Sequence, residues 1–147
     1  MPPHRTIRPP GLNPRLTAGV CIVRPPARFS NEGWTVGLLG SRYTMTGSYF
    51  VGRLREHYGI NVLVAEGERQ ANVHNALYGE LAMGTLLPAT REKFKAAIAD
   101  LVRRGAQAVI LGCTEFGMLL EAKDSPVPLI DTTLAHAQAA VEIALQD

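Results

Sequence analysis

The feature that most constrains the fold is a short apolar run that ends abruptly in polar residues. Residues 108–111 are Ala-Val-Ile-Leu and are followed by Gly112, Cys113, Thr114 and Glu115. An apolar run of this length is too short for a helix and is typical of a strand buried on both faces of a parallel sheet. Gly112 allows a tight turn, and threonine is a residue type that caps helices. We therefore predict that Cys113 lies between the carboxyl end of a central strand and the start of a helix.

This position favours a reactive cysteine. Open α/β sheets bind their ligands at the carboxyl ends of the strands. The positive end of a helix dipole at that edge would favour the thiolate form of Cys113 over the thiol. The cysteine is a candidate nucleophile, base or metal ligand, and the alternative is a small buried residue without chemistry. The flanking glycine and polar residues favour function, and because the four histidines are scattered, we expect no metal site.

Strands and helices alternate from residue 34 onward. The predicted strands, the last of which contains prolines suited to a sheet edge, are residues 34–40, 60–64, 108–111 and 126–130. The predicted helices are residues 45–58, 68–83, 90–104 (capped by Thr90), a short segment ending near 122, and 132–146 (capped by residues 131–133). Right-handed crossovers then predict a doubly wound α/β fold, with a four-stranded, mostly parallel sheet and helices on both faces.

The first 31 residues have a different composition. They contain seven of the ten prolines, five arginines and no acidic residue. We expect residues 1–31 to form a disordered or extended arm and residues 32–147 to form the α/β domain, closed by a C-terminal helix. The arm accounts for a charge of +5 in a chain of net charge +2, which leaves −3 on the remainder. The basic surplus therefore does not predict a folded nucleic-acid surface.

The cysteine content and the hydropathy predict a cytoplasmic protein. The two cysteines, Cys21 and Cys113, are far apart, which suggests free thiols in a reducing compartment. The start of the chain does not resemble a secretory signal, and no apolar run approaches the roughly 18–20 residues that span a membrane. We therefore expect no membrane partner.

Polar residues also follow the first predicted strand. Residues 40–44 include Ser41 and Thr44. Because parallel strands end at one edge of a sheet, these hydroxyls are expected near Cys113, where they would suit a carboxylate or a phosphate. The glycines at positions 37 and 40 lack the spacing of the phosphate-binding motifs, which disfavours a nucleotide.

Four segments in order resemble the aspartate/glutamate racemase family. These are residues 38–45 (Leu-Leu-Gly-Ser-Arg-Tyr-Thr-Met), 105–110, 111–115 (Leu-Gly-Cys-Thr-Glu) and 125–133. The resemblance covers about residues 34–146 and corresponds to the second of that family's two similar α/β domains. It implies a cofactor-independent racemase in which two cysteines, one from each domain, move a proton at Cα of an amino acid, here aspartate or glutamate.

The resemblance also implies roles for individual residues. Cys113 is identified as a catalytic cysteine, and Thr114, Thr44 and Ser41 as residues that bind the substrate carboxylate. Glu115 stands where glutamate racemases generally have histidine, which is typical of the aspartate-type branch, and it is included among the substrate-binding residues.

The family's first domain, with its own cysteine, has no counterpart in this sequence. Cys21 has no strand–turn–helix context and is not expected to act as the second base. We therefore expect a racemase-like protein that is impaired as an isolated half. The alternatives are a non-catalytic truncated module that pairs with a separate first-half domain, and a one-cysteine carboxylic-acid enzyme of related architecture. Apolar surface left uncovered by the missing domain would favour a homo-oligomer.

Overall fold

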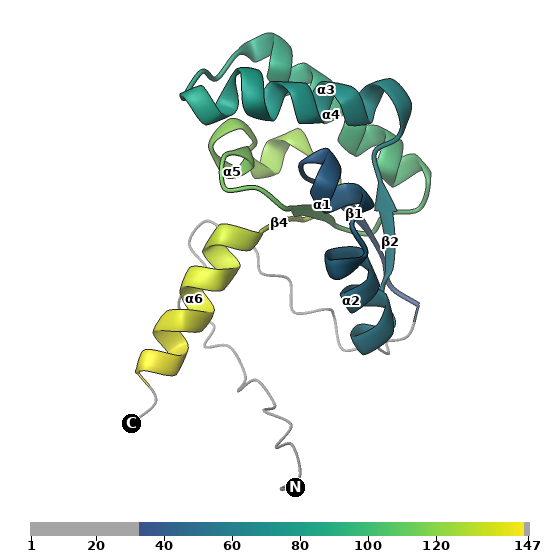
Figure 1. Cartoon of the computed structure of the whole chain (residues 1–147), viewed down its shortest axis with the longest axis vertical. Coiled ribbons are helices and arrows are strands. Elements are labelled where there is room, and N and C mark those ends of the chain that lie inside the picture. Colours follow the sequence, from purple (N-terminus) through teal and green to yellow (C-terminus); the bar gives the residue numbers. More distant parts are fainter. Residues whose placement is uncertain (1–32, 146–147) are drawn as a thin grey trace, which may run out of the picture.

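Four parallel strands form the sheet, in the order β2-β1-β3-β4. The computed structural model describes residues 33–145, so the arm predicted at residues 1–31 lies outside the described residues. The strands are β1 (Thr35–Leu39), β2 (Asn61–Val64), β3 (Val109–Leu111) and β4 (Leu129–Asp131). The prediction of a doubly wound α/β fold is confirmed (Figure 1). The last strand lies at the sheet edge as expected, but it begins at Leu129, so Pro126 and Pro128 precede the strand instead of belonging to it.

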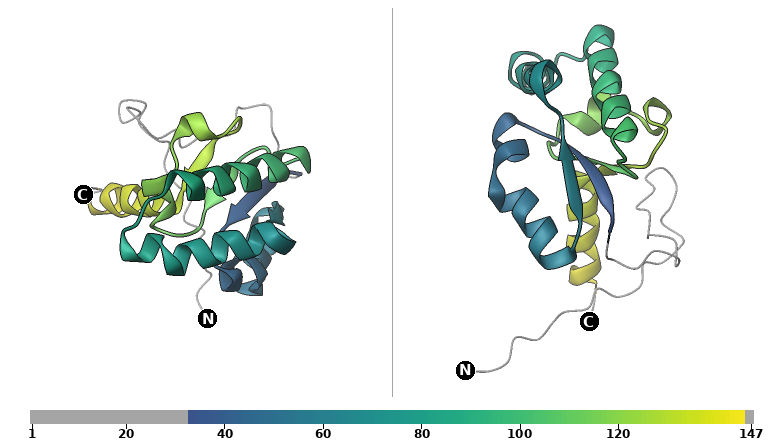
Figure 2. Two further views of the ribbon diagram at one scale, coloured as in Figure 1. Left: turned by 90° about the horizontal axis from the view of Figure 1, so that it is seen from above. Right: turned by 90° about the vertical axis from the view of Figure 1, so that its right-hand side faces the viewer.

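Helices cover both faces of this sheet. The α-helices are α1 (Arg42–Thr46), α2 (Ser48–Tyr58), α3 (Gly67–Gly79), α4 (Pro88–Arg103), α5 (Phe116–Leu119) and α6 (Thr132–Ala144). Two 3₁₀ turns, η2 (Leu81–Met83) and η3 (Ala122–Asp124), follow α3 and α5. Figure 2 shows α2 and α4 on opposite sides of the strands. No helix within residues 33–145 is long and apolar enough to cross a lipid bilayer.

The core lies on both sides of the sheet because successive strand residues face opposite layers. In β3, Val109 and Leu111 belong to a large buried cluster that includes side chains of α3, α4 and α5. Ile110 belongs to a smaller cluster with Val36 and Leu38, against which α2 packs. The central strand is therefore buried on both faces, as its continuous apolar sequence predicts.

The helix predicted at residues 45–58 is in fact two helices. The side chain of Ser41 accepts a hydrogen bond from the backbone N–H of Thr44, and this cap starts α1 earlier than predicted. Gly47 then interrupts the helix with an extended backbone (φ −73°, ψ 133°). A Cβ at Gly47 would lie only 2.6 Å from the carbonyl oxygen of Tyr43, so glycine suits this bend.

The prediction that Thr90 caps the third helix is wrong. The helix α4 begins at Pro88, whose fixed φ and missing N–H suit the first helical position. Thr90 is therefore inside the first turn and is almost fully buried. Its hydroxyl donates a hydrogen bond to the carboxylate of Glu80, which comes from the connection between α3 and η2.

The C-terminal helix α6 is capped as predicted but extends away from the sheet (Figure 1). The carboxylate of Asp131 accepts hydrogen bonds from the backbone N–H groups of Thr133 (2.8 Å) and Leu134 (3.3 Å). The hydroxyl of Thr132 donates to the carbonyl oxygen of Leu111 at 2.8 Å, which ties the start of the helix to the end of β3. No residue of α6 is buried by the rest of the described chain.

Candidate functional site

Cys113 lies directly after the carboxyl end of β3, where its side chain is a half-buried free thiol. Gly112 brings this turn against the end of β1. Its backbone N–H donates to the carbonyl oxygen of Leu39 at 2.8 Å, and a Cβ at this position would lie 2.9 Å from the same oxygen. Only a glycine therefore allows the ends of β3 and β1 to approach this closely and to hold Cys113 at the edge of the sheet.

The end of β1 supplies hydroxyl groups beside the cysteine. The backbone of Ser41 makes a hydrogen bond to the Cys113 thiol. The hydroxyl oxygens of Ser41 and Thr44 lie 3.1 Å apart, and the Tyr49 hydroxyl lies 3.5 Å from that of Thr44. The structure thus brings Cys113, Ser41 and Thr44 together from the ends of two adjacent strands.

Tyr49 was not predicted as a site residue. It belongs to α2, on the far side of the bend at Gly47, so no single helical pattern relates it to Thr44. Its side chain is 66% exposed. The spacing of residues in the sequence does not reveal that this exposed aromatic ring lies beside polar groups. The bend is what returns its hydroxyl toward the site.

The surroundings of Cys113 favour the thiol over the thiolate. Burial of the side chain raises the pKa of Cys113, the hydrogen bond from the Ser41 backbone lowers it, and the negative charge of Glu115 raises it further. The pKa is raised overall, so the prediction of a thiolate favoured by a helix dipole is wrong. The main reason is burial of the sulfur, to which the charge of Glu115 at the N-cap position of α5 adds. The helix α5 is only a single turn of four residues, so its dipole offers little to offset them.

Thr114 and Glu115 differ in their placement. Thr114 is exposed and lies next to the cysteine in the chain, whereas Glu115 is half-buried and close enough to act on the thiol electrostatically. Thr114 does not cap α5, because the helix starts one residue later than the sequence suggests. Within residues 33–145, no group of three His, Cys, Asp or Glu side chains is arranged to hold a metal ion.

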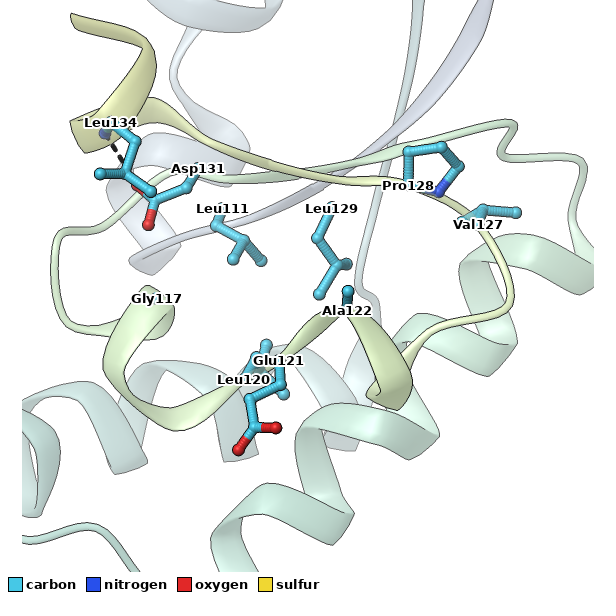
Figure 3. Close-up of a pocket in the computed structure, with 10 residues that line it drawn as sticks. All are labelled: Leu111, Gly117, Leu120, Glu121, Ala122, Val127, Pro128, Leu129, Asp131 and Leu134. Atoms are coloured by element: carbon cyan, nitrogen blue, oxygen red, sulfur yellow. Dashed lines mark hydrogen bonds between the residues drawn. The ribbon is translucent and has the colours of Figure 1, made fainter. Parts of the chain in front are cut away.

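A cavity of about 450 Å³ lies beside this edge, between β4 and the segment from α5 to η3 (Figure 3). Its walls are mostly apolar, with the carboxylates of Glu121 and Asp131 at the rim. The Asp131 carboxylate also lies against Gly117, where a Cβ would be 2.1 Å from its Oδ2. None of the five predicted site residues lines the cavity, so the candidate site is the exposed edge around Cys113 and not this hollow.

Comparison with known proteins relates this arrangement to one family. Residues 26–140 match the family model described as Asp/Glu/Hydantoin racemase. A solved structure from Yersinia pestis, assigned as an Asp/Glu racemase, is 40% identical with a TM-score of 0.73, and the match covers 76% of this chain and 49% of that one. An aspartate racemase homologue from Pyrococcus horikoshii OT3 is 30% identical with a TM-score of 0.67, over 75% of this chain and 48% of that one.

A third similar structure, the aspartate racemase of Picrophilus torridus, is 26% identical with a TM-score of 0.58. That match covers 76% of this chain and 45% of the other. The chain therefore spans about half the length of each of these three solved structures.

Proposed function

Because the chain belongs to the Asp/Glu/hydantoin racemase family, we propose that it is an amino-acid racemase of the aspartate/glutamate type, in which Cys113 moves a proton at Cα. The proposed reaction uses neither a pyridoxal group nor a metal ion. The observation that carries the proposal is the position of Cys113, a half-buried thiol at the carboxyl end of the central strand beside the hydroxyls of Ser41 and Thr44. A reduced thiol is required, which agrees with the cytoplasmic location expected from the sequence.

The proton chemistry suits a cysteine with a raised pKa. As a base, the thiolate accepts the Cα proton, so that a C–H bond breaks and an S–H bond forms. The Cα–H group is a very weak acid, and a thiolate whose conjugate thiol has a raised pKa is a stronger base toward it. The raised pKa favours the thiol form of Cys113, which can donate a proton to Cα, while its thiolate form accepts one.

The hydroxyl groups at the end of β1 are suited to the carboxylate of the substrate. We assign Ser41, Thr44 and Thr114 to this role because hydroxyl and backbone N–H donors satisfy carboxylate oxygens. The side chain of Glu115 has the opposite charge to the substrate's ammonium group and lies near the thiol, so we assign it to that end of the amino acid.

A single thiol serves only one face of Cα. Inversion requires proton removal from one face and delivery to the other, which calls for two acid/base groups. Within residues 33–145, Cys113 is the cysteine available, so one copy of the chain by itself is expected to exchange the α-proton more readily than it inverts the centre.

The test is to incubate the full chain with each enantiomer of aspartate and glutamate in heavy water. Loss of the Cα proton is followed by NMR, and the enantiomers are separated by chiral chromatography. We expect deuterium exchange that Cys113→Ala abolishes and the matched variant Cys21→Ala retains. Exchange that survives Cys113→Ala would exclude this cysteine, and the absence of exchange with all four amino acids would exclude the proposed substrates.

A further inference from the structure

The helix α6 carries apolar side chains that nothing in the described chain covers. Val141 and Ile143 in its last turn and Leu145, its C-cap residue, are 55%, 71% and 78% exposed. The helix has 13 residues and none is buried. Isolated helices shorter than about 12–15 residues are marginal in water, so a helix of this length needs a packing surface to stay folded. Figure 1 shows that α6 leaves the sheet at the end of β4 without crossing another helix.

Exposed apolar side chains also surround the candidate site. Tyr43 and Tyr49 come from α1 and α2, which follow β1, and Met118 comes from α5, which follows β3; their exposures are 70%, 66% and 58%. Leu134, in the first turn of α6 after β4, is 39% exposed. These four side chains follow the carboxyl ends of three strands, so they share the edge that holds Cys113. A polar site bordered by large apolar residues is typical of a protein interface.

From these observations we propose that a second copy of this chain covers the Cys113 edge and α6, and that its own Cys113 provides the second acid/base group. This inference rests on the proposed racemase function. In a two-fold dimer each surface meets its own copy, so an unpaired helix finds an identical helix and a thiol faces an identical thiol across the substrate.

The charges of the chain permit this pairing. Residues 33–145 contain 10 basic and 11 acidic residues, a net charge of −1, so two copies repel each other only weakly. In α6, Glu142 is the single acidic residue and no lysine or arginine occurs, which leaves a nearly neutral helix surface. Opposed helices of this kind bury apolar area without burying unpaired charges.

The protons balance in the dimer. The thiolate of one copy takes the Cα proton, which breaks a C–H bond and forms an S–H bond. The thiol of the second copy delivers its proton to the opposite face, which breaks its S–H bond and forms the new C–H bond. The two sulfurs have then exchanged protonation states, and proton exchange with solvent water restores them before the next turnover. No reactant other than water is needed.

The experiment measures association and thiol proximity without any substrate turnover. The full chain carrying Cys21→Ser is analysed by sedimentation and is treated with dibromobimane, which becomes strongly fluorescent when it bridges two thiols. We expect a species of twice the chain mass and a fluorescent bridged dimer, which Cys113→Ser removes. Val141→Asp combined with Leu145→Asp should return the chain to the monomer mass and abolish bridging. The matched control is Met83→Asp, an equally exposed apolar side chain of η2, which should retain both signals.

The possible outcomes separate the inference from the proposed function. A monomer throughout the micromolar range, or a dimer in which the two Cys113 thiols are not bridged, would overturn the inference. Bridging that persists in the α6 variant would overturn the role of that helix. A bridged dimer that exchanges no proton with any of the four amino acids would support the interface and refute the substrate assignment alone.

Discussion

At Cys113, burial and the charge of Glu115 outweigh the hydrogen bond from the Ser41 backbone. These three influences act on the same sulfur but come from different parts of the chain: the local turn, the next helix and the end of a neighbouring strand. Their balance raises the pKa of Cys113 and therefore favours the thiol over the thiolate. The protonation state of a single residue is thus a property of the folded edge.

This balance predicts the effect of removing one charge. Glu115→Gln removes a negative charge near the sulfur and should lower the pKa of Cys113, because the thiolate is then less disfavoured. The rate of alkylation by iodoacetamide against pH, measured in a Cys21→Ser background, gives this pKa. Glu92→Gln is the matched control, since Glu92 forms a surface pair with Lys95. An unchanged or raised pKa in Glu115→Gln would contradict the assignment.

A second prediction at the residue scale concerns Gly112. In Gly112→Ala the new Cβ would lie 2.9 Å from the backbone oxygen of Leu39 and 3.2 Å from Cδ1 of Leu38, so the ends of β1 and β3 must separate. We expect a loss of about 1–3 kcal/mol in the free energy of unfolding, as for other overpacked sites. Urea denaturation measures it. Gly79→Ala, which meets no atom within 4 Å, is the control and should retain full stability.

Among the elements, α4 and η3 are joined by a charged contact. The Arg91 guanidinium lies 2.7 Å from the Asp124 carboxylate and 3.3 Å from that of Glu121. The same Asp124 oxygen accepts the backbone N–H of Glu121 at 2.8 Å, so one carboxylate both pairs with α4 and caps η3. The hydrogen bond from Arg91 is the main reason that the pKa of Asp124 is lowered.

The lowered pKa makes this contact pH-dependent. A carboxyl whose pKa is lower in the folded than in the unfolded state stabilises the fold above its unfolded pKa, and this contribution disappears as the pH falls through the folded pKa. Arg91→Ala should therefore destabilise the chain at neutral pH. Its stability should then decrease less on acidification than the stability of the parent chain does. Thermal unfolding between neutral and acidic pH tests this. The control is Arg103→Ala, which removes an exposed pair with Asp100. If Arg91→Ala and the parent chain lost equal stability on acidification, the Arg91–Asp124 contact would not be the source of the pH dependence.

Over the whole molecule, the two faces of the sheet differ in how fully they are covered. Phe94 of α4 is fully buried and contacts Phe116 of α5 edge-to-face, with ring centroids 4.9 Å apart. On the other face, Phe50 of α2 is only half-buried against its smaller cluster. The stability of the domain therefore depends chiefly on the layer formed by α3, α4 and α5.

The matched pair Phe94→Ala and Phe50→Ala tests this asymmetry. Removal of a fully buried phenylalanine costs about 3–5 kcal/mol, because the lost transfer free energy adds to that of a cavity. Phe50→Ala should cost clearly less, since its ring already meets solvent. Chemical denaturation of both variants compares the two costs, and a larger loss for Phe50→Ala would mean that the α2 layer dominates.

The sequence alone determined the order of elements, the fold class and the position of Cys113 at a strand end. These follow from local causes: a short apolar run such as residues 108–111 is typical of a buried strand, Gly112 permits its tight turn, and Asp131 caps the helix that follows it. The resemblance to racemases arose from the same short segments, and the family match confirms it.

The tertiary structure decided what depends on residues distant in the chain. Ser41 and Cys113 meet only because β1 and β3 are neighbours in the sheet, and the resulting burial determines the protonation of the thiol. The start of α4 at Pro88 places Thr90 against Glu80, and the bend at Gly47 brings Tyr49 to Thr44. Desolvation and contact depend on which elements pack together, and a one-dimensional pattern constrains only the conformation of each segment and the face that it buries.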